Sequence, residues 1–138
     1  MTGENRLANA LAEATLGDDA LRAANALLTL ELWNDAVSRA YYAAFHYGRV
    51  LLLLEGLEPQ THRGVIALLT THYEKSGRLS PDIISAFARL QTFRGLADYD
   101  SRERLPRERA EAEVGAAERF VTTAREMLAA AVRTGSKN

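Results

Sequence analysis

The segment SRAYYAAFHYGRVLLLLE, residues 38–55, constrains the fold more than any other part of the chain. Wound as a helix at about 100° per residue, it places one set of side chains along one face and a second set roughly opposite. The first set is Val37, Tyr41, Ala44, Gly48 and Leu51, and the second is Arg39, Tyr42, His46 and Leu53. A helix that is apolar or aromatic nearly all round is usually buried on two sides. We therefore expect it to lie at the centre of a bundle, with its second face against another helix or a second subunit.

Length and composition limit the classes of protein that the chain can belong to. Its 138 residues suit a single domain over 1–138, with a core over about 18–132 and a frayed tail at 133–138. The net charge of -1 gives no bulk attraction to nucleic acid or anionic membrane, which leaves only local basic patches. No cysteine is present, so disulfide scaffolds and thiolate metal sites are excluded. The polar N-terminus and the lack of a long apolar run predict a cytoplasmic protein without a membrane span.

Helix signals in the first half of the chain predict two or three helices. Residues 4–31 carry apolar side chains at helical spacing, and Gly17 can either kink one helix or separate two. Asn34 or Asp35 is the expected cap of the central helix, which Gly56 would end. Whether one or two helices precede residue 33 stays open.

The second half predicts three further helices. Thr61 can cap a helix that Gly77 stops, and Ser80, Pro81 and Asp82 together give the clearest helix start in the chain. After a connection rich in arginine, Pro106 restarts a last helix. That helix is expected to bury Val114, Ala117, Val121, Ala124, Leu128 and Val132. With no convincing strand pattern, the chain predicts an all-α, antiparallel up-and-down bundle of four to five helices.

An arginine in the fourth long helix is the first candidate for chemistry. Arg94 falls on the same helical line as Phe87 and Leu90, the side that packs, and Asp98 follows one turn later. An arginine before an aspartate is the weaker orientation for such a pair, and an aspartate in the last turn opposes the helix dipole. This placement favours a site, whereas the alternative is a closed internal pair.

Two histidines are further candidates. His46, with Tyr42 before it and Arg49 after it, can form a polar cluster on the second face of the central helix, although hydrogen-bonded packing is the commoner use of such a histidine. His62 and Arg63, at a helix start, could hold a phosphate near backbone N–H groups. The alternative for His62 is an ordinary exposed first turn.

Several familiar sites are missing from the sequence. It has no Glu-x-x-His pair for a di-iron bundle, no Cys/His zinc spacing, no glycine-rich phosphate loop and no Gly-x-Ser-x-Gly. We therefore expect no metal and no cofactor.

Four segments in fixed order carry a family resemblance. They are SRAYYAAFHYGRVLL, THRGVIALL, EKSGRL and FRGLADYD. Over roughly Asp18 to Leu128 the chain resembles the HEPN superfamily, in the branch with a YYAxFH helix and an RxxADY ending. The resemblance implies an antiparallel bundle of four or five helices that forms a homodimer through the central helices.

The same resemblance implies a function. Many HEPN proteins are metal-independent ribonucleases in which an arginine and a histidine four to six residues later meet across the dimer. Arg94 matches the arginine, Tyr99 stands five residues on, and His46 would have to supply the missing histidine. Members are also encoded beside a minimal nucleotidyltransferase as toxin and antitoxin, and Tyr99 is the position where a nucleotide would be accepted.

These observations combine into two hypotheses. The first is a homodimer that binds RNA or a nucleotide, with metal-independent ribonuclease chemistry as its expected activity. It works with a nucleotidyltransferase partner in a toxin–antitoxin or stress-defence system. Its proposed catalytic residues are Arg94, Tyr99 and His46, and its proposed ligand-binding residues are Arg94, Asp98, Tyr99, Tyr42, Arg39 and His62. The second is a non-catalytic dimeric interaction module that docks a protein partner.

Overall fold

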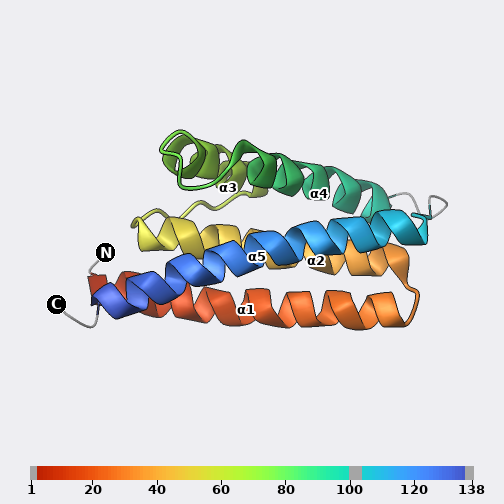
Figure 1. The fold of residues 1–138 in the computed structure, drawn as a ribbon, viewed down its shortest axis with the longest axis horizontal. Helices are drawn as coiled ribbons and strands as arrows, with labels where there is room; N and C mark the ends of the chain where they lie inside the picture. Colours follow the sequence, from red (N-terminus) through yellow and green to blue (C-terminus); the bar gives the residue numbers. More distant parts are fainter. Residues whose placement is uncertain (1–2, 100–103, 136–138) are drawn as a thin grey trace.

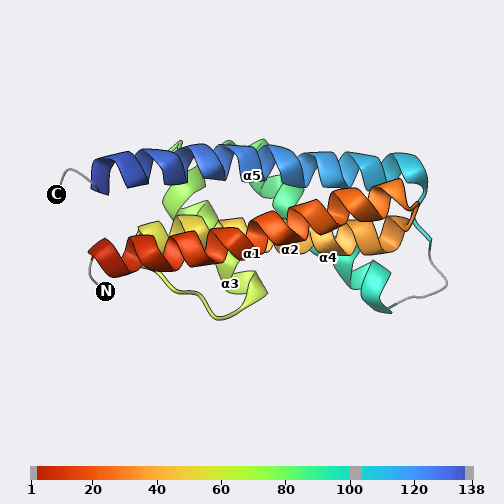
Figure 2. The same cartoon turned by 90° about the horizontal axis from the view of Figure 1, so that it is seen from below.

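The computed structural model describes residues 3–99 and 104–135, with the side chains of Glu4 and of residues 94–99 left out. Within those residues every regular element is helical, which confirms the predicted all-α bundle. Long helices run alternately up and down the bundle, as Figures 1 and 2 show. The elements are α1 (Gly3–Thr29), α2 (Trp33–Leu54), α3 (His62–Leu69), the π-helical turn η1 (Thr70–Glu74), α4 (Pro81–Tyr99) and α5 (Arg107–Gly135).

Helix α2 lies at the centre and packs against α1, α3, α4 and α5. The first face predicted from the sequence is buried along its whole length. At Gly48, a side-chain Cβ would lie 2.8 Å from Val65 of α3 and 3.0 Å from Phe87 of α4. The glycine therefore lets both helices approach α2 closely. Helix α1 covers the other side of α2 from α4 (Figure 1).

Gly17 does not divide the first helical stretch, because α1 is one helix of 27 residues. A Cβ at Gly17 would lie 2.5 Å from Cδ2 of Tyr47. The missing side chain makes room for the buried Tyr47 ring against the α1 backbone. The glycine thus serves the packing of α1 on α2, and the open choice between one helix and two is settled in favour of one.

The predicted turn signals at the later helices are confirmed. Thr61 Oγ1 accepts a hydrogen bond from Gly64 N at 2.9 Å, and Ser80 Oγ accepts one from Ile83 N at 3.3 Å. Gly56 and Gly77 adopt φ values of 78° and 80°, the left-handed conformation that glycine takes without strain. The last helix begins directly after Pro106, as expected.

The predicted cap of α2 is wrong. The helix begins at Trp33, before both expected cap residues, and no side chain caps it. Asn34 Oδ1 instead accepts a hydrogen bond from Leu105 N at 2.8 Å. The capping group is therefore used to attach the segment before α5 to the start of α2.

The predicted burial of Val132 is also wrong, since 38% of it is exposed, whereas the five earlier residues of that stripe are buried. In Figure 1 the ends of α5 and α1 extend beyond α2, so fewer neighbours remain there to cover the stripe. Helix α5 continues to Gly135, into the tail expected to fray, and residues 136–138 lie outside the described part.

Candidate functional site

His46 forms a polar cluster with α1. Its Nδ1 lies 2.6 Å from Oε2 of Glu13, and Nε of Arg49 lies 3.3 Å from Oε1 of the same carboxylate. The His46 side chain is 22% exposed and that of Glu13 is 13% exposed. One carboxylate on α1 therefore joins two residues that stand one helical turn apart on α2.

The carboxylate of Glu13 orients the imidazole. Burial raises the pKa of Glu13, but the hydrogen bond from His46 and the charge of Arg49 outweigh it and hold the pKa below its ordinary value. The carboxylate is thus ionised at neutral pH and accepts the proton on Nδ1, so in the neutral form of the ring the lone pair lies on Nε2. Within the described residues Nε2 has no hydrogen-bond partner. A carboxylate-oriented imidazole with a free ring nitrogen is suited to take up a proton.

The position of His46 around α2 separates it from α4 of the same chain. Gly48 faces α3 and α4, and His46, two residues earlier, lies about 200° away around the helix axis. Its polar contact is accordingly with α1. Within one chain the structure therefore does not place His46 beside the helix that carries Arg94.

The other candidates of the second face gather around α3. His62 stacks on Phe45 with ring centroids 4.4 Å apart, and its Nδ1 hydrogen-bonds the Tyr41 hydroxyl. The Tyr42 ring stands edge-on to His62 at 6.2 Å, and the Arg39 guanidinium lies 4.7 Å above the Tyr42 ring. His62 is thus packed and hydrogen-bonded, unlike a residue of an ordinary exposed first turn. Arg39, Tyr42 and His62 lie together, and Phe45 also contacts His46 at 5.5 Å.

Arg94, Asp98 and Tyr99 belong to the last turns of α4 by the bounds of that helix. Their side chains lie outside the described residues. Both the site hypothesis and the closed-pair alternative for Arg94 and Asp98 therefore stay predictions.

Sequence reasoning missed two carboxylates on α1. Glu13 is 33 residues from His46, so no helical spacing links them. Asp18 Oδ1 accepts hydrogen bonds from the Tyr47 hydroxyl and from Arg125 Nη2, each at 2.6 Å. Burial and the hydrogen bond to Asp18 raise the pKa of Tyr47 to about 12, against the opposing effect of Arg125. This second cluster joins α1, α2 and α5.

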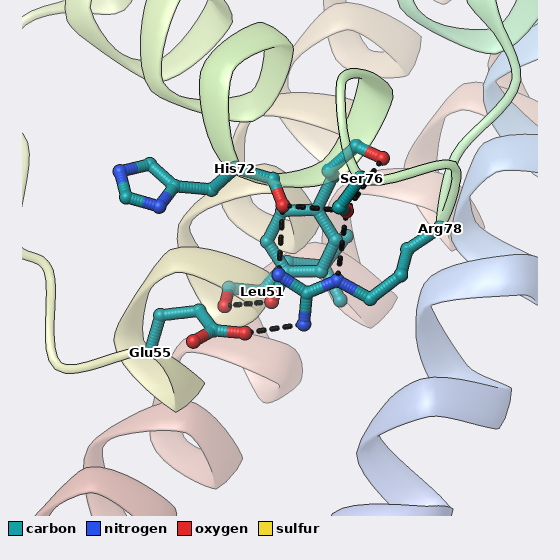
Figure 3. Close-up of polar contacts among 6 residues, drawn as sticks. Leu51, Glu55, His72, Ser76 and Arg78 are labelled. Carbon is teal, nitrogen blue, oxygen red and sulfur yellow. Dashed lines mark hydrogen bonds and ion pairs between the residues drawn. The ribbon is translucent and has the colours of Figure 1, made fainter.

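A third polar cluster closes the turn after η1 (Figure 3). The Arg78 guanidinium lies 4.2 Å from the centre of the Tyr73 ring, bonds the His72 carbonyl at 2.7 Å and pairs with Glu55. The Tyr73 hydroxyl donates to the Leu51 carbonyl at 2.5 Å. In Figure 3 the His72 ring points away from this network. The cluster attaches the turn to the end of α2.

The described residues contain neither a metal site nor a membrane span. In residues 3–99 and 104–135 no three His, Asp or Glu side chains lie together as a metal site would need. No helix among the described residues is long and apolar enough to cross a bilayer.

The comparisons with known proteins agree with this geometry of packed helices. The model of the HEPN domain matches residues 16–130, which is most of the chain. The chain belongs to the HEPN family. The HEPN match includes α2, α3, η1 and α4 entirely, and it begins after Glu13, so the carboxylate that orients His46 comes from outside the matched span.

Relatives of this HEPN chain occur in archaea and bacteria. Two are from Methanocaldococcus jannaschii and both are named "Putative toxin": one is 33% identical over 82% of this chain and 84% of the relative, the other 30% identical over 68% and 64%. A protein named "UPF0332 protein" from Gloeobacter violaceus is 32% identical over 81% of this chain and 90% of that protein. Two of these three relatives therefore carry the word toxin in their names.

Proposed function

We propose that the chain is the RNA-acting toxin of a two-component toxin–antitoxin pair. The observation that carries this proposal is the HEPN match over residues 16–130 together with two relatives named "Putative toxin". The His46–Glu13 pair supports it from the structure, because it supplies a proton acceptor without a metal.

The proposed reaction is metal-independent RNA cleavage. His46 Nε2 takes the proton from a ribose 2′-hydroxyl, and the resulting oxygen attacks the adjacent phosphorus. The bond from phosphorus to the 5′-oxygen breaks, which leaves a 2′,3′-cyclic phosphate on one fragment and, after protonation, a 5′-hydroxyl on the other. Arg94 would neutralise the developing phosphate charge, Asp98 would orient Arg94, and Tyr99 would hydrogen-bond the RNA.

The proposed site needs two copies of the chain. His46 contacts α1, whereas α4 of the same chain packs on the side of α2 that carries Gly48. A homodimer in which α4 of one copy approaches His46 of the other would complete the pair. The antitoxin we propose is a minimal nucleotidyltransferase. It would transfer a nucleoside monophosphate from a nucleoside triphosphate to the Tyr99 hydroxyl, which loses its proton as pyrophosphate leaves, and so block the site.

The test combines growth and cleavage. Induced expression in a bacterial host should arrest growth, and the purified protein should cut a labelled single-stranded RNA in the presence of EDTA. Arg94→Ala and His46→Gln should each lower RNA cleavage by about a hundredfold or more and relieve the growth arrest. Arg22→Gln, a change at an exposed arginine of α1, should leave both effects intact. Cleavage at the normal rate in both variants, or no cleavage and no growth arrest by the unaltered chain, would remove the proposal.

A second candidate is a non-catalytic dimeric interaction module. It is favoured by two exposed leucines at the turn between α1 and α2, Leu30 at 66% and Leu32 at 45% exposure. It predicts a stable complex with a protein partner that is lost in Leu30→Ser/Leu32→Ser, while RNA stays intact in every assay.

A further inference from the structure

A groove lies between the N-terminal half of α4 and the middle of α5, two helices that run side by side in Figure 1. Its volume is about 340 Å³. Its lining combines two arginines, a serine and an aspartate with short apolar side chains: Asp82, Ile83, Ser85, Ala86, Arg89, Ala116 and Arg119. It involves neither the Glu13–His46 cluster nor the last turns of α4.

A buried carboxylate fixes Arg89 at the groove. Glu113 on α5 is only 1% exposed, and its two oxygens lie 2.9 and 3.2 Å from Nε of Arg89. A buried carboxylate is costly without such a partner, so the pair holds the guanidinium in place. The contact uses Nε, and in the described part of the chain the two terminal nitrogens of Arg89 make no hydrogen bond.

A second arginine and a hydroxyl lie across the same groove. Arg119 is exposed, and neither its guanidinium nor the Ser85 hydroxyl has a polar partner among the described side chains. Arginine presents several N–H donors in a planar fork that matches the oxygens of a phosphate. The terminal nitrogens of Arg89, the guanidinium of Arg119 and the hydroxyl of Ser85 are therefore hydrogen-bond donors without an acceptor among the described residues.

The local charge favours an anion. Arg89, Arg109 and Arg119 contribute three positive charges, and Arg109 Nη1 lies 3.9 Å from Glu113. Glu113 and Asp82 contribute two negative charges, so one positive charge remains. Asp82, at the first turn of α4, would repel a phosphate placed next to it but can accept N–H groups.

We propose that this groove binds the phosphate group of a nucleotide, either free or within an RNA chain. Arg89 and Arg119 hold the phosphate, Ser85 donates to it, and Asp82 accepts an N–H group of the base. The volume lies near the lower end of about 300–1,000 Å³ for small-molecule sites, which suits one nucleotide. The inference goes beyond the proposed function, because this surface is separate from the proposed cleavage site.

The experiment measures binding by the full chain to two probes. Uridine 5′-monophosphate is titrated by NMR, and a fluorescein-labelled octauridylate is titrated by fluorescence anisotropy. Arg119→Gln should weaken binding of at least one probe about tenfold, the effect of one charge-assisted hydrogen bond. Arg22→Gln removes the same charge from an exposed site on α1 and should change binding less than about twofold.

A second variant tests Arg89 without leaving a buried charge unpaired. Arg89→Gln/Glu113→Gln removes both members of the pair, and it should weaken the same probe while circular dichroism shows a folded bundle. Loss for the mononucleotide identifies a free nucleotide as the ligand, and loss for the octauridylate alone identifies RNA.

The outcomes separate this inference from the proposed function. The proposed phosphate site is wrong if Arg119→Gln binds both probes as tightly as the unaltered chain, or if neither probe binds the unaltered chain. If Arg94→Ala abolishes RNA binding while Arg119→Gln does not, the proposed function stands and the groove fails. If Arg119→Gln weakens binding and the RNA stays uncut, the groove stands and the ribonuclease proposal fails.

Discussion

His46 and Tyr47 are neighbours on α2 that have the same types of partner but differ in how many of their polar atoms are bonded. Each ring hydrogen-bonds a carboxylate of α1, and each carboxylate also pairs with an arginine. Tyr47 is 1% exposed, and its single polar atom is committed to Asp18 and Arg125. His46 is 22% exposed and commits only one of its two ring nitrogens. The same three-part arrangement therefore holds the Tyr47 hydroxyl completely, whereas at His46 it leaves Nε2 without a hydrogen-bond partner among the described residues.

The difference arises from the direction of each residue around α2. Tyr47 points between α1 and α5, against the bare backbone of Gly17, where no solvent reaches its ring. His46 contacts Glu13 of α1 at a place where burial is incomplete. Substitutions at Tyr47 should accordingly affect stability, and substitutions at His46 should affect activity.

The largest effect on stability is expected from Gly17→Ala. The added Cβ would lie 2.5 Å from the Tyr47 ring, and overpacking of this kind lowers the free energy of unfolding by about 1–3 kcal/mol. Urea denaturation followed by circular dichroism measures it. Gly115→Ala is the matched control, since its nearest neighbour is the flexible end of Arg119 at 3.6 Å and helix propensity should stabilise it by up to about 1 kcal/mol. Equal stabilisation by both changes would show that the Tyr47 ring is not held against Gly17.

Tyr47→Phe should come next, with a loss of about 1 kcal/mol for the partly buried hydrogen bond from the Tyr47 hydroxyl to Asp18. Because the pKa of Tyr47 is raised to about 12, its contribution is complete below the ordinary value of 10 and disappears as the pH rises towards 12. The stability difference between the unaltered chain and the variant should therefore shrink over that interval. A constant difference up to pH 12 would show that the Tyr47 hydroxyl is not held by Asp18.

Glu13→Gln should have a smaller effect, about 1 kcal/mol or less, because the cluster is partly exposed. The lowered pKa of Glu13 means that its stabilisation is present above the ordinary value of 4.5 and is lost as the pH falls through the lowered value. Thermal unfolding at a series of pH values from neutral to strongly acidic should show the two proteins converging at the acid end. If the stabilities of the two proteins instead moved apart at acid pH, the pKa of Glu13 would be raised in the folded chain and not lowered.

The smallest effect on stability is expected from His46→Gln, within about 0.5 kcal/mol, because glutamine can still donate to Glu13. RNA cleavage should nevertheless fall by about a hundredfold or more, the contribution of a general base. Initial rates on labelled RNA measure this. If the variant is stable and cleaves RNA at the normal rate, His46 has only a structural role, as Tyr47 does.

Local signals predicted the helices well where the deciding interactions are local. Ser80 and Thr61 cap their helices as the sequence indicates, because a cap bonds a backbone group only three residues away. Asn34 carries the same type of signal, but its oxygen is taken by Leu105, 71 residues later. A tertiary contact of that kind leaves no periodic trace in the sequence.

Only the α2 residues of the candidate site, and not their partners on α1, could be predicted from the sequence. The two faces of α2 follow from helical periodicity, so His46 and Tyr42 could be singled out in advance. Glu13 and Asp18 could not, because the partner of a side chain on another helix depends on how the two helices are rotated and shifted against each other. The roles of Arg94, Asp98 and Tyr99 still rest on their order in the sequence and on the family.

The central position of α2 has a consequence for the order in which the molecule opens. Every other helix packs on α2, so its backbone can reach solvent only when the whole bundle comes apart. Its buried amide hydrogens should therefore exchange with deuterium last, at the rate of global unfolding. The turn closed by Arg78 should exchange much earlier, because Arg78 is exposed and pairs with the partly exposed Glu55 at the end of α2.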